Sequence, residues 1–164
     1  LSEKNPVRRR FLKNPILSDK DFAAAWQSLE YKGKPFENDF PELRTDKGER
    51  VRSKSEMLIA NKLAALGIPY RYEFPHQMRD RHGFKITVYP DFTILNRTNR
   101  SEIILEHFGR LEDPEYIAAS LSKLDLYSRN GYFPGKNFLF TMETNRNPFD
   151  IRLFEKQIRI SGLF

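Results

Sequence analysis

Hydrophobic residues recur at helical spacing in two stretches of the first third of the chain. Residues 18–31 predict a helix with Ser18 as its N-cap and Trp26 as a packing anchor on the apolar face. Residues 53–66 predict a second helix, because apolar residues form a stripe between a Ser-x-x-Glu capping box and a terminating glycine. Glycine and proline interrupt residues 32–50, which we therefore expect to form a linker or covering loop.

The middle of the chain alternates with period two, which is typical of strands. We expect strands at residues 70–74, 84–95 and 102–108, and a polar turn at 76–83 whose two histidines are exposed. In the long second strand, alternation places four apolar residues on one face: Ile86, Val88, Phe92 and Ile94.

The last third returns to helical spacing around one further strand. Residues 114–130 predict a helix capped by Asp113, residues 136–142 a strand, and residues 147–160 a last helix with Leu153 on its core side. Three sequential strands followed by a helical crossover to a fourth strand predict an α/β fold with a mixed sheet between helices.

Two acidic residues interrupt apolar strand sequences. Asp91 follows a proline inside Y-P-D-F-T-I-L, and Glu106 closes the run E-I-I-L-E; a polar turn joins the two strands. A buried carboxylate is costly unless it is paired, hydrogen-bonded or bound to a metal. Because the hairpin can bring the two acids together, they are candidate ligands for an oxygen-preferring cation such as Mg2+. The simpler alternative is a pair of solvated or salt-bridged strand-end acids.

Composition limits the chemistry further. The 164 residues fit one domain, and the absence of cysteine excludes disulfides, thiolate catalysis and zinc–thiolate sites. Three histidines without metal-site spacing disfavour a histidine-built zinc centre. No apolar run is long enough for a membrane helix, and no signal peptide is evident, so we expect an intracellular, cytoplasmic protein without a membrane partner.

The net charge of +6 favours polyanionic partners, nucleic acid first. The triplet Arg8, Arg9 and Arg10 is a candidate phosphate-contacting arm, although a solvated arm is the simpler interpretation.

The order of these elements, with Glu56 in the second helix, Y-P-D-F around Asp91 and I-L-E-H-F-G around Glu106, resembles the PD-(D/E)XK nuclease superfamily. The pattern D-P-E-Y…K…Y-x-x-N-G that follows is similar to nuclease-like domains with E-H-x-G in the third core strand. The resemblance implies a restriction-endonuclease-like core at residues 49–164, with residues 1–48 as an N-terminal extension containing one helix.

The resemblance also implies roles for individual residues. Asp91 and Glu106 would bind Mg2+ or Mn2+ together with the backbone carbonyl of His107. Glu56 would hold a water molecule or a second ion, or would only cap its helix.

The superfamily places a lysine two residues after the second acid, where this chain has Phe108. We expect Lys123, on the following helix, to supply the missing amine. Tyr127, one turn further along that helix, could contact a phosphate. Lys54, beside Glu56, is a further candidate for substrate binding.

Three functions remain open at this point. The first is a metal-dependent nuclease that cleaves nucleic acid, with DNA favoured over RNA. The second is an inactive nuclease-fold module that binds nucleic acid, with Phe108 marking the decay of the site. The third is an assembly domain of a larger parent protein, with residues 1–48 as the interaction segment. Substrate specificity could come from residues 1–48, from a homodimer or from a partner.

Overall fold

A four-stranded mixed sheet forms the centre of the computed structural model, which describes residues 17–37 and 39–163. The sheet has the order β3-β6-β7-β8 and consists of β3 (Tyr70–Tyr72), β6 (Phe92–Leu95), β7 (Glu102–Phe108) and β8 (Phe138–Met142). Its first three strands are antiparallel neighbours, whereas β8 lies parallel to β7.

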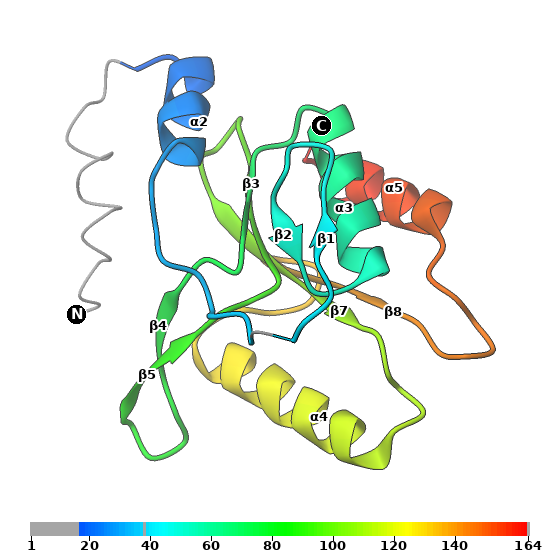
Figure 1. Cartoon of the computed structure of the whole chain (residues 1–164). Helices are drawn as coiled ribbons and strands as arrows, with labels where there is room; N and C mark the ends of the chain where they lie inside the picture. The colour runs from blue at the N-terminus through cyan, green and yellow to red at the C-terminus, as the bar shows by residue number, and fades with distance from the viewer. Residues whose placement is uncertain (1–16, 38, 164) are drawn as a thin grey trace.

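Helices cover both faces of this sheet. Helices α3 (Lys54–Ala65) and α5 (Ile151–Ile160) pack on one face, and α4 (Pro114–Arg129) lies across the other (Figure 1). The α4 helix also forms the crossover that makes β8 parallel to β7. The predicted α/β class with a mixed sheet between helices is therefore confirmed. Among residues 17–37 and 39–163, no helix is both long and apolar enough to cross a membrane.

The first described helix, α2 (Asp19–Gln27), packs against the sheet through Phe22 and Trp26, which are buried together with Leu95 of β6. Trp26 is buried, and its indole nitrogen donates to Glu102 Oε1 at 2.8 Å. The guanidinium of Arg71 lies 3.9 Å from the centroid of the Trp26 ring, an electrostatically favourable cation–π geometry. Both the Ser18 N-cap and the anchoring role of Trp26 are confirmed.

The segment predicted as a covering loop contains half of a small hairpin. Strands β1 (Leu43–Arg44) and β2 (Arg50–Val51) pair across a turn that includes Gly48. The expected boundary between residues 48 and 49 falls in this turn. The strands are only two residues long, too short for an alternating pattern to reveal them.

Two predictions for residues 76–95 are wrong. The supposed polar turn contains β4 (His76–Arg79), and His76 is buried, with its Nε2 2.7 Å from Thr93 Oγ1. The supposed long strand is two strands, β5 (Lys85–Val88) and β6, because the chain leaves the ladder around Pro90. This break sends the apolar residues of β5 and β6 to different faces.

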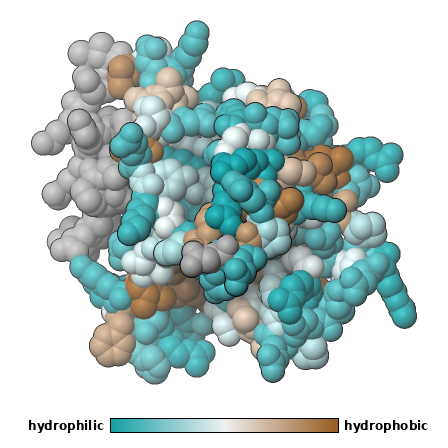
Figure 2. All heavy atoms as spheres, in the orientation of Figure 1, coloured by the Kyte–Doolittle hydropathy of each residue, from teal (hydrophilic) through white to brown (hydrophobic). Residues whose placement is uncertain are grey.

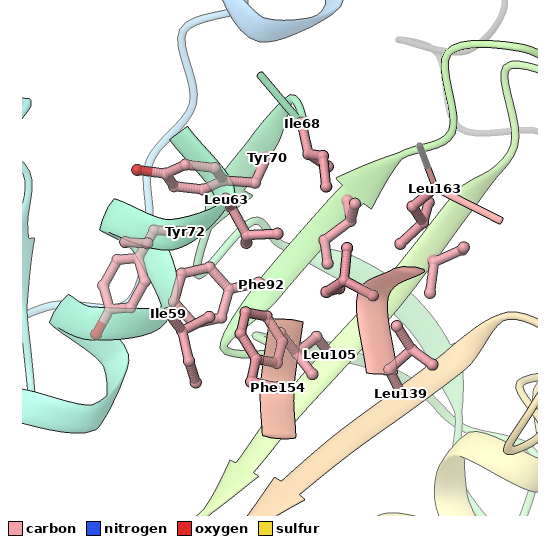
Figure 3. Packing of buried hydrophobic residues seen from close by; sticks show 14 of the residues in the cluster. Ile59, Leu63, Ile68, Tyr70, Tyr72, Phe92, Leu105, Leu139, Phe154 and Leu163 are labelled. Carbon is pink, nitrogen blue, oxygen red and sulfur yellow. The ribbon is translucent and has the colours of Figure 1, made fainter. Parts of the chain in front are cut away.

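Alternation along the central strands separates two hydrophobic clusters. The larger cluster joins α3 and α5 to one face of the sheet and includes Ile59, Leu63, Phe92, Leu105 and Phe154 (Figure 3). The smaller cluster, on the α4 face, contains Met78, Ile104, Tyr127 and Phe138, with Ile86 and Val88 packed against it. Burial of these side chains is the main force that holds the layers together.

Polar side chains cap the N-termini of α3 and α5. Ser53 Oγ accepts the Glu56 N–H at 3.1 Å, which confirms the predicted start of α3, and Gly67 follows its end with a φ of 65°. The last helix begins later than predicted, because Asp150 caps it by accepting the Arg152 N–H at 2.8 Å. Leu153 is 67% exposed, so its predicted core position is wrong.

Candidate active site

Asp91 and Glu106 meet on the α4 face of the sheet. The antiparallel register pairs Phe92 with Leu105, so one step further along the hairpin places Asp91 opposite Glu106. The two carboxyl groups are near enough for the charge of Glu106 to raise the pKa of Asp91. The sequence-based prediction that the hairpin brings these two acids together is confirmed.

Two residues of α4 hold the Glu106 carboxylate. Lys123 Nζ donates to Glu106 Oε2 at 2.8 Å, and the hydroxyl of Tyr127 donates to Glu106 Oε1. Both come from one face of α4 because they are four residues apart. Glu106 is 1% exposed, so these two partners compensate a carboxylate that has almost no contact with solvent.

Asp91 is oriented by the backbone of the neighbouring strand. Its Oδ2 accepts the His107 N–H at 2.7 Å, while its own carbonyl accepts the Glu73 N–H at 3.0 Å. Burial, followed by repulsion from Glu106, raises the pKa of Asp91 to about 8, although Lys123 and the His107 N–H act in the opposite direction. Near neutral pH, therefore, Asp91 holds a proton that a bound cation could replace.

Lys123 occupies the position predicted for the amine. Burial works against its charge, but Glu106 and Asp91 together raise the pKa of Lys123 above its usual value. The ammonium is therefore a positive charge fixed beside two acids. Phe108, where the resemblance led us to expect a lysine, is buried, and its ring centroid lies 6.1 Å from that of Phe140, so this position belongs to the aromatic packing.

Glu56 lies at the start of α3, and the charge of Asp91 influences its pKa. Its Oε2 accepts the Arg52 N–H at 2.9 Å and the Tyr72 hydroxyl at 2.7 Å, which accounts for its position structurally. Burial, and then the charge of Asp91, raise the pKa of Glu56. The carboxylate thus lies within electrostatic range of Asp91, without a direct contact to it.

The remaining candidate site residues differ in their positions in the structure. Tyr127 is fully buried and supports Glu106, which is a different role from the phosphate contact expected for it. Lys54 is exposed in the first turn of α3. Arg8, Arg9 and Arg10 lie outside the described residues.

A second polar group, which the sequence did not indicate, lies behind the acid pair. The His107 ring points to the opposite face from Glu106, as alternation predicts, with Nδ1 2.8 Å from Thr141 Oγ1 and Nε2 3.1 Å from Glu143 Oε1. Glu143 also accepts from Ser55 Oγ at 2.9 Å. These residues lie far apart in the chain and follow no motif, so only the fold could reveal the group.

The backbone carbonyl of His107, the predicted third ligand, lies near Tyr116. The Tyr116 hydroxyl is 3.4 Å from this oxygen and accepts the Gly109 N–H at 3.1 Å. At 3.4 Å the contact to the carbonyl is a weak hydrogen bond. The oxygen therefore keeps most of its capacity to accept.

The donor set fits a small divalent cation. Two facing carboxylates and one carbonyl oxygen are the hard ligands that Mg2+ prefers, and Mg2+ commonly retains several waters beside one or two protein carboxylates. Burial, and then the charge of Glu106, raise the pKa of Asp91, and a bound cation would offset both effects. Among the described residues, no group of three or more His, Asp or Glu side chains is placed to hold a metal, so protein carboxylates alone would not saturate the ion.

Comparison with known proteins adds one relative. An uncharacterized protein from Methanocaldococcus jannaschii is 38% identical over 89 residues, which is 54% of this chain. The match spans 7% of the length of that protein. No family model and no solved structure matches the chain.

Proposed function

We propose that the protein is a divalent-metal-dependent nuclease that hydrolyses phosphodiester bonds, and we favour DNA as the substrate. The observation that carries the proposal is the pair of neighbouring acids, buried Glu106 and partly buried Asp91, with Lys123 Nζ donating to Glu106 at 2.8 Å. A structural salt bridge needs one acid and one base, whereas here two acids compete for one lysine. Strongly perturbed acids beside a fixed cation are a common feature of catalytic sites.

Each residue would have a distinct task. Asp91 and Glu106, with the His107 carbonyl, would hold Mg2+ or Mn2+, which when bound supplies Lewis acidity that activates water and offsets phosphate charge. Lys123 stays protonated because its pKa is raised, so it would stabilise negative charge on the phosphate instead of removing a proton. Tyr127 would keep Glu106 in its orientation.

A second function is favoured by one specific observation. Phe108 stands where the superfamily has its lysine, and Lys123 forms an ion pair with Glu106. In a nuclease-fold module that only binds nucleic acid, the same ion pair would simply neutralise Glu106. The two proposals differ in whether metal binding leads to cleavage.

The test is cleavage of supercoiled plasmid and single-stranded DNA in Mg2+ or Mn2+, with Mn2+ binding measured by calorimetry. Asp91→Asn should abolish both cleavage and Mn2+ binding, whereas Lys123→Ala should abolish cleavage and retain binding. Lys62→Ala is the matched control, since Lys62 forms a partly buried ion pair with Glu155 at 2.9 Å. A native chain that binds Mn2+ and nucleic acid but cleaves neither substrate would contradict the nuclease proposal and support the binding module.

A further inference from the structure

The hairpin β4–β5 leaves the main sheet next to the acid pair. It forms a separate two-stranded sheet in which His76 pairs with Val88 and Arg79 with Lys85. At its base, the Glu73 N–H donates to the Asp91 carbonyl at 3.0 Å, so β4 begins and β5 ends beside the candidate active site. Figure 1 shows the hairpin projecting at the lower left, away from the sheet.

One side of this hairpin is fastened to the protein. Met78 is buried and Ile86 and Val88 are partly buried in the cluster on the α4 face, and the Asn130 side chain bonds both the N–H and the carbonyl of Arg79 at 2.9 Å. The hairpin is therefore a supported arm, with one apolar face that anchors it and one face that points outward.

The outward face has the side chains of a nucleic-acid contact. Gln77 and Thr87 pair across the strands, as do Arg79 and Lys85, and all four residues are exposed. Arginine, lysine, glutamine and threonine are side chains that bind base edges and phosphates. No acid stands among the four, so this face is basic as well as polar.

The tip carries a further feature that core packing does not explain. Phe84 is 69% exposed, and the exposed Arg81 lies in the same turn. Asp80 shapes the turn by accepting the N–H groups of His82 at 2.8 Å and Phe84 at 2.9 Å. Figure 2 shows hydrophobic atoms at the surface where this hairpin lies, in a face that is mostly hydrophilic.

The dimensions fit double-stranded DNA. The major groove of B-form DNA admits a two-stranded β-ribbon, whereas the major groove of A-form RNA is too narrow for protein side chains to read. Phe84 stands seven residues before Asp91, so at about 3.4 Å per residue the tip reaches up to about 24 Å from the acids. A duplex in contact with the hairpin can thus also place a phosphate near Asp91, the partly buried member of the acid pair.

We propose that β4–β5 is a DNA-binding ribbon whose outward face (Gln77, Arg79, Lys85 and Thr87) enters the major groove of duplex DNA, with Phe84 contacting bases or sugars at the tip. This inference rests on the proposed nuclease function for its orientation, because it names the substrate of that site as double-stranded DNA. The binding itself needs no metal and no cleavage.

The test is binding of a fluorescein-labelled DNA duplex and of an RNA duplex of the same sequence, measured by anisotropy in EDTA across a salt series. Arg79→Ala/Lys85→Ala should weaken DNA binding about tenfold or more and reduce the salt slope by about 2, since each phosphate contact contributes about 0.9. Phe84→Ala should weaken DNA binding without changing the slope. The control Arg152→Ala/Lys156→Ala removes the same charge from exposed positions of α5 and should bind like the native chain.

Equal affinity of the native chain for both duplexes would overturn the major-groove assignment. If the hairpin and α5 double variants lose the same amount of DNA affinity, the loss reflects net charge alone, and the ribbon proposal is overturned. The nuclease proposal fails separately: if the ribbon variants lose DNA binding but no metal supports cleavage, the ribbon stands and the nuclease does not. If the native chain cleaves DNA but the ribbon variants bind DNA normally, the nuclease proposal stands and the ribbon proposal is overturned.

Discussion

The two faces of strand β7 differ although their residues alternate along one short segment. Leu105 faces α3 and α5 in a cluster that is almost entirely apolar (Figure 3), whereas Glu106, the next residue, faces α4 and is held by Lys123 and Tyr127. Both side chains are buried to a similar degree. The difference shows that burial on the first face stabilises the fold, while burial on the second creates an electrostatic conflict.

Such a conflict is expected where a protein gives up stability for function. On the α4 face, burial and the charge of Glu106 disfavour the ionisation of Asp91, and one lysine, bonded to Glu106, lies near both acids. The apolar side chains on the opposite face pack without such a conflict. Changes on the two faces should therefore have opposite consequences for stability and activity.

The largest effect should follow from Asp91→Asn, which keeps the shape of the side chain but cannot lose a proton to bind a cation as a carboxylate. Cleavage should fall by roughly 1,000-fold or more, a loss typical of removing a catalytic group. The folded state should be at least as stable as before, because asparagine avoids the free-energy cost of the raised Asp91 pKa. Rate measurements combined with urea unfolding check both parts; a variant that cleaves normally would separate Asp91 from catalysis.

Leu105→Ala should have the opposite profile. A buried leucine reduced to alanine on the α3–α5 face leaves a cavity and should cost about 2–5 kcal/mol in the free energy of unfolding. The acid pair lies on the other face, so the Mn2+ affinity of the folded fraction should be unchanged. Urea unfolding and calorimetry at low temperature measure the two quantities, and a parallel loss of Mn2+ affinity would show that the faces are coupled.

The pH dependence of stability should distinguish Asp91 from the other acids. The pKa of Asp91 is raised from 3.8 to about 8, so between these values the folded state holds a proton that the unfolded state has released. Without metal, stability should therefore fall as pH rises from about 4 to 8, by an amount on the order of a few kcal/mol.

The comparison for this prediction is Asp91→Asn, in which that contribution is absent. The native chain should lose stability relative to the variant as pH rises, and Mg2+ should restore it at pH 8. Glu56, Glu106 and Lys123 also surround Asp91 and remain in both proteins, so the difference between the two unfolding curves isolates Asp91. A difference that does not change with pH would show that Asp91 is already ionised at low pH.

The smallest effect should follow from Tyr127→Phe. The ring remains in its packing between α4 and the sheet, and only the hydroxyl that donates to Glu106 is lost. Stability should change by about 1 kcal/mol, while Mn2+ affinity should fall about 10-fold or more because the carboxylate is less well oriented. A Tyr127→Phe chain with native Mn2+ affinity would contradict the supporting role of the hydroxyl.

Periodicity was a good guide wherever an element was long and regular. It located α4 and β7, and the spacing of Lys123 and Tyr127 placed them on one helix face, where the structure finds both against Glu106. It failed where few residues decide the geometry. The break around Pro90 moved Ile86 and Val88 to the α4 face, and His76 was buried by the partner strand of a hairpin that its own sequence did not show.

By itself, the sequence determined the order of the helices and of the central-sheet strands, the α/β class, the capping of α3 and the meeting of Asp91 with Glu106. These features depend on neighbours within one helix, strand or hairpin, which local spacing specifies. Only the tertiary structure decided that Tyr127 supports Glu106 from a buried position, that His107 joins Glu143 and Ser55, and that β4–β5 forms a projecting ribbon. Those arrangements depend on how separate elements pack. Side chains that are distant in the chain can neutralise each other's charge, and can shield each other from water, only after the sheet and helices have assembled.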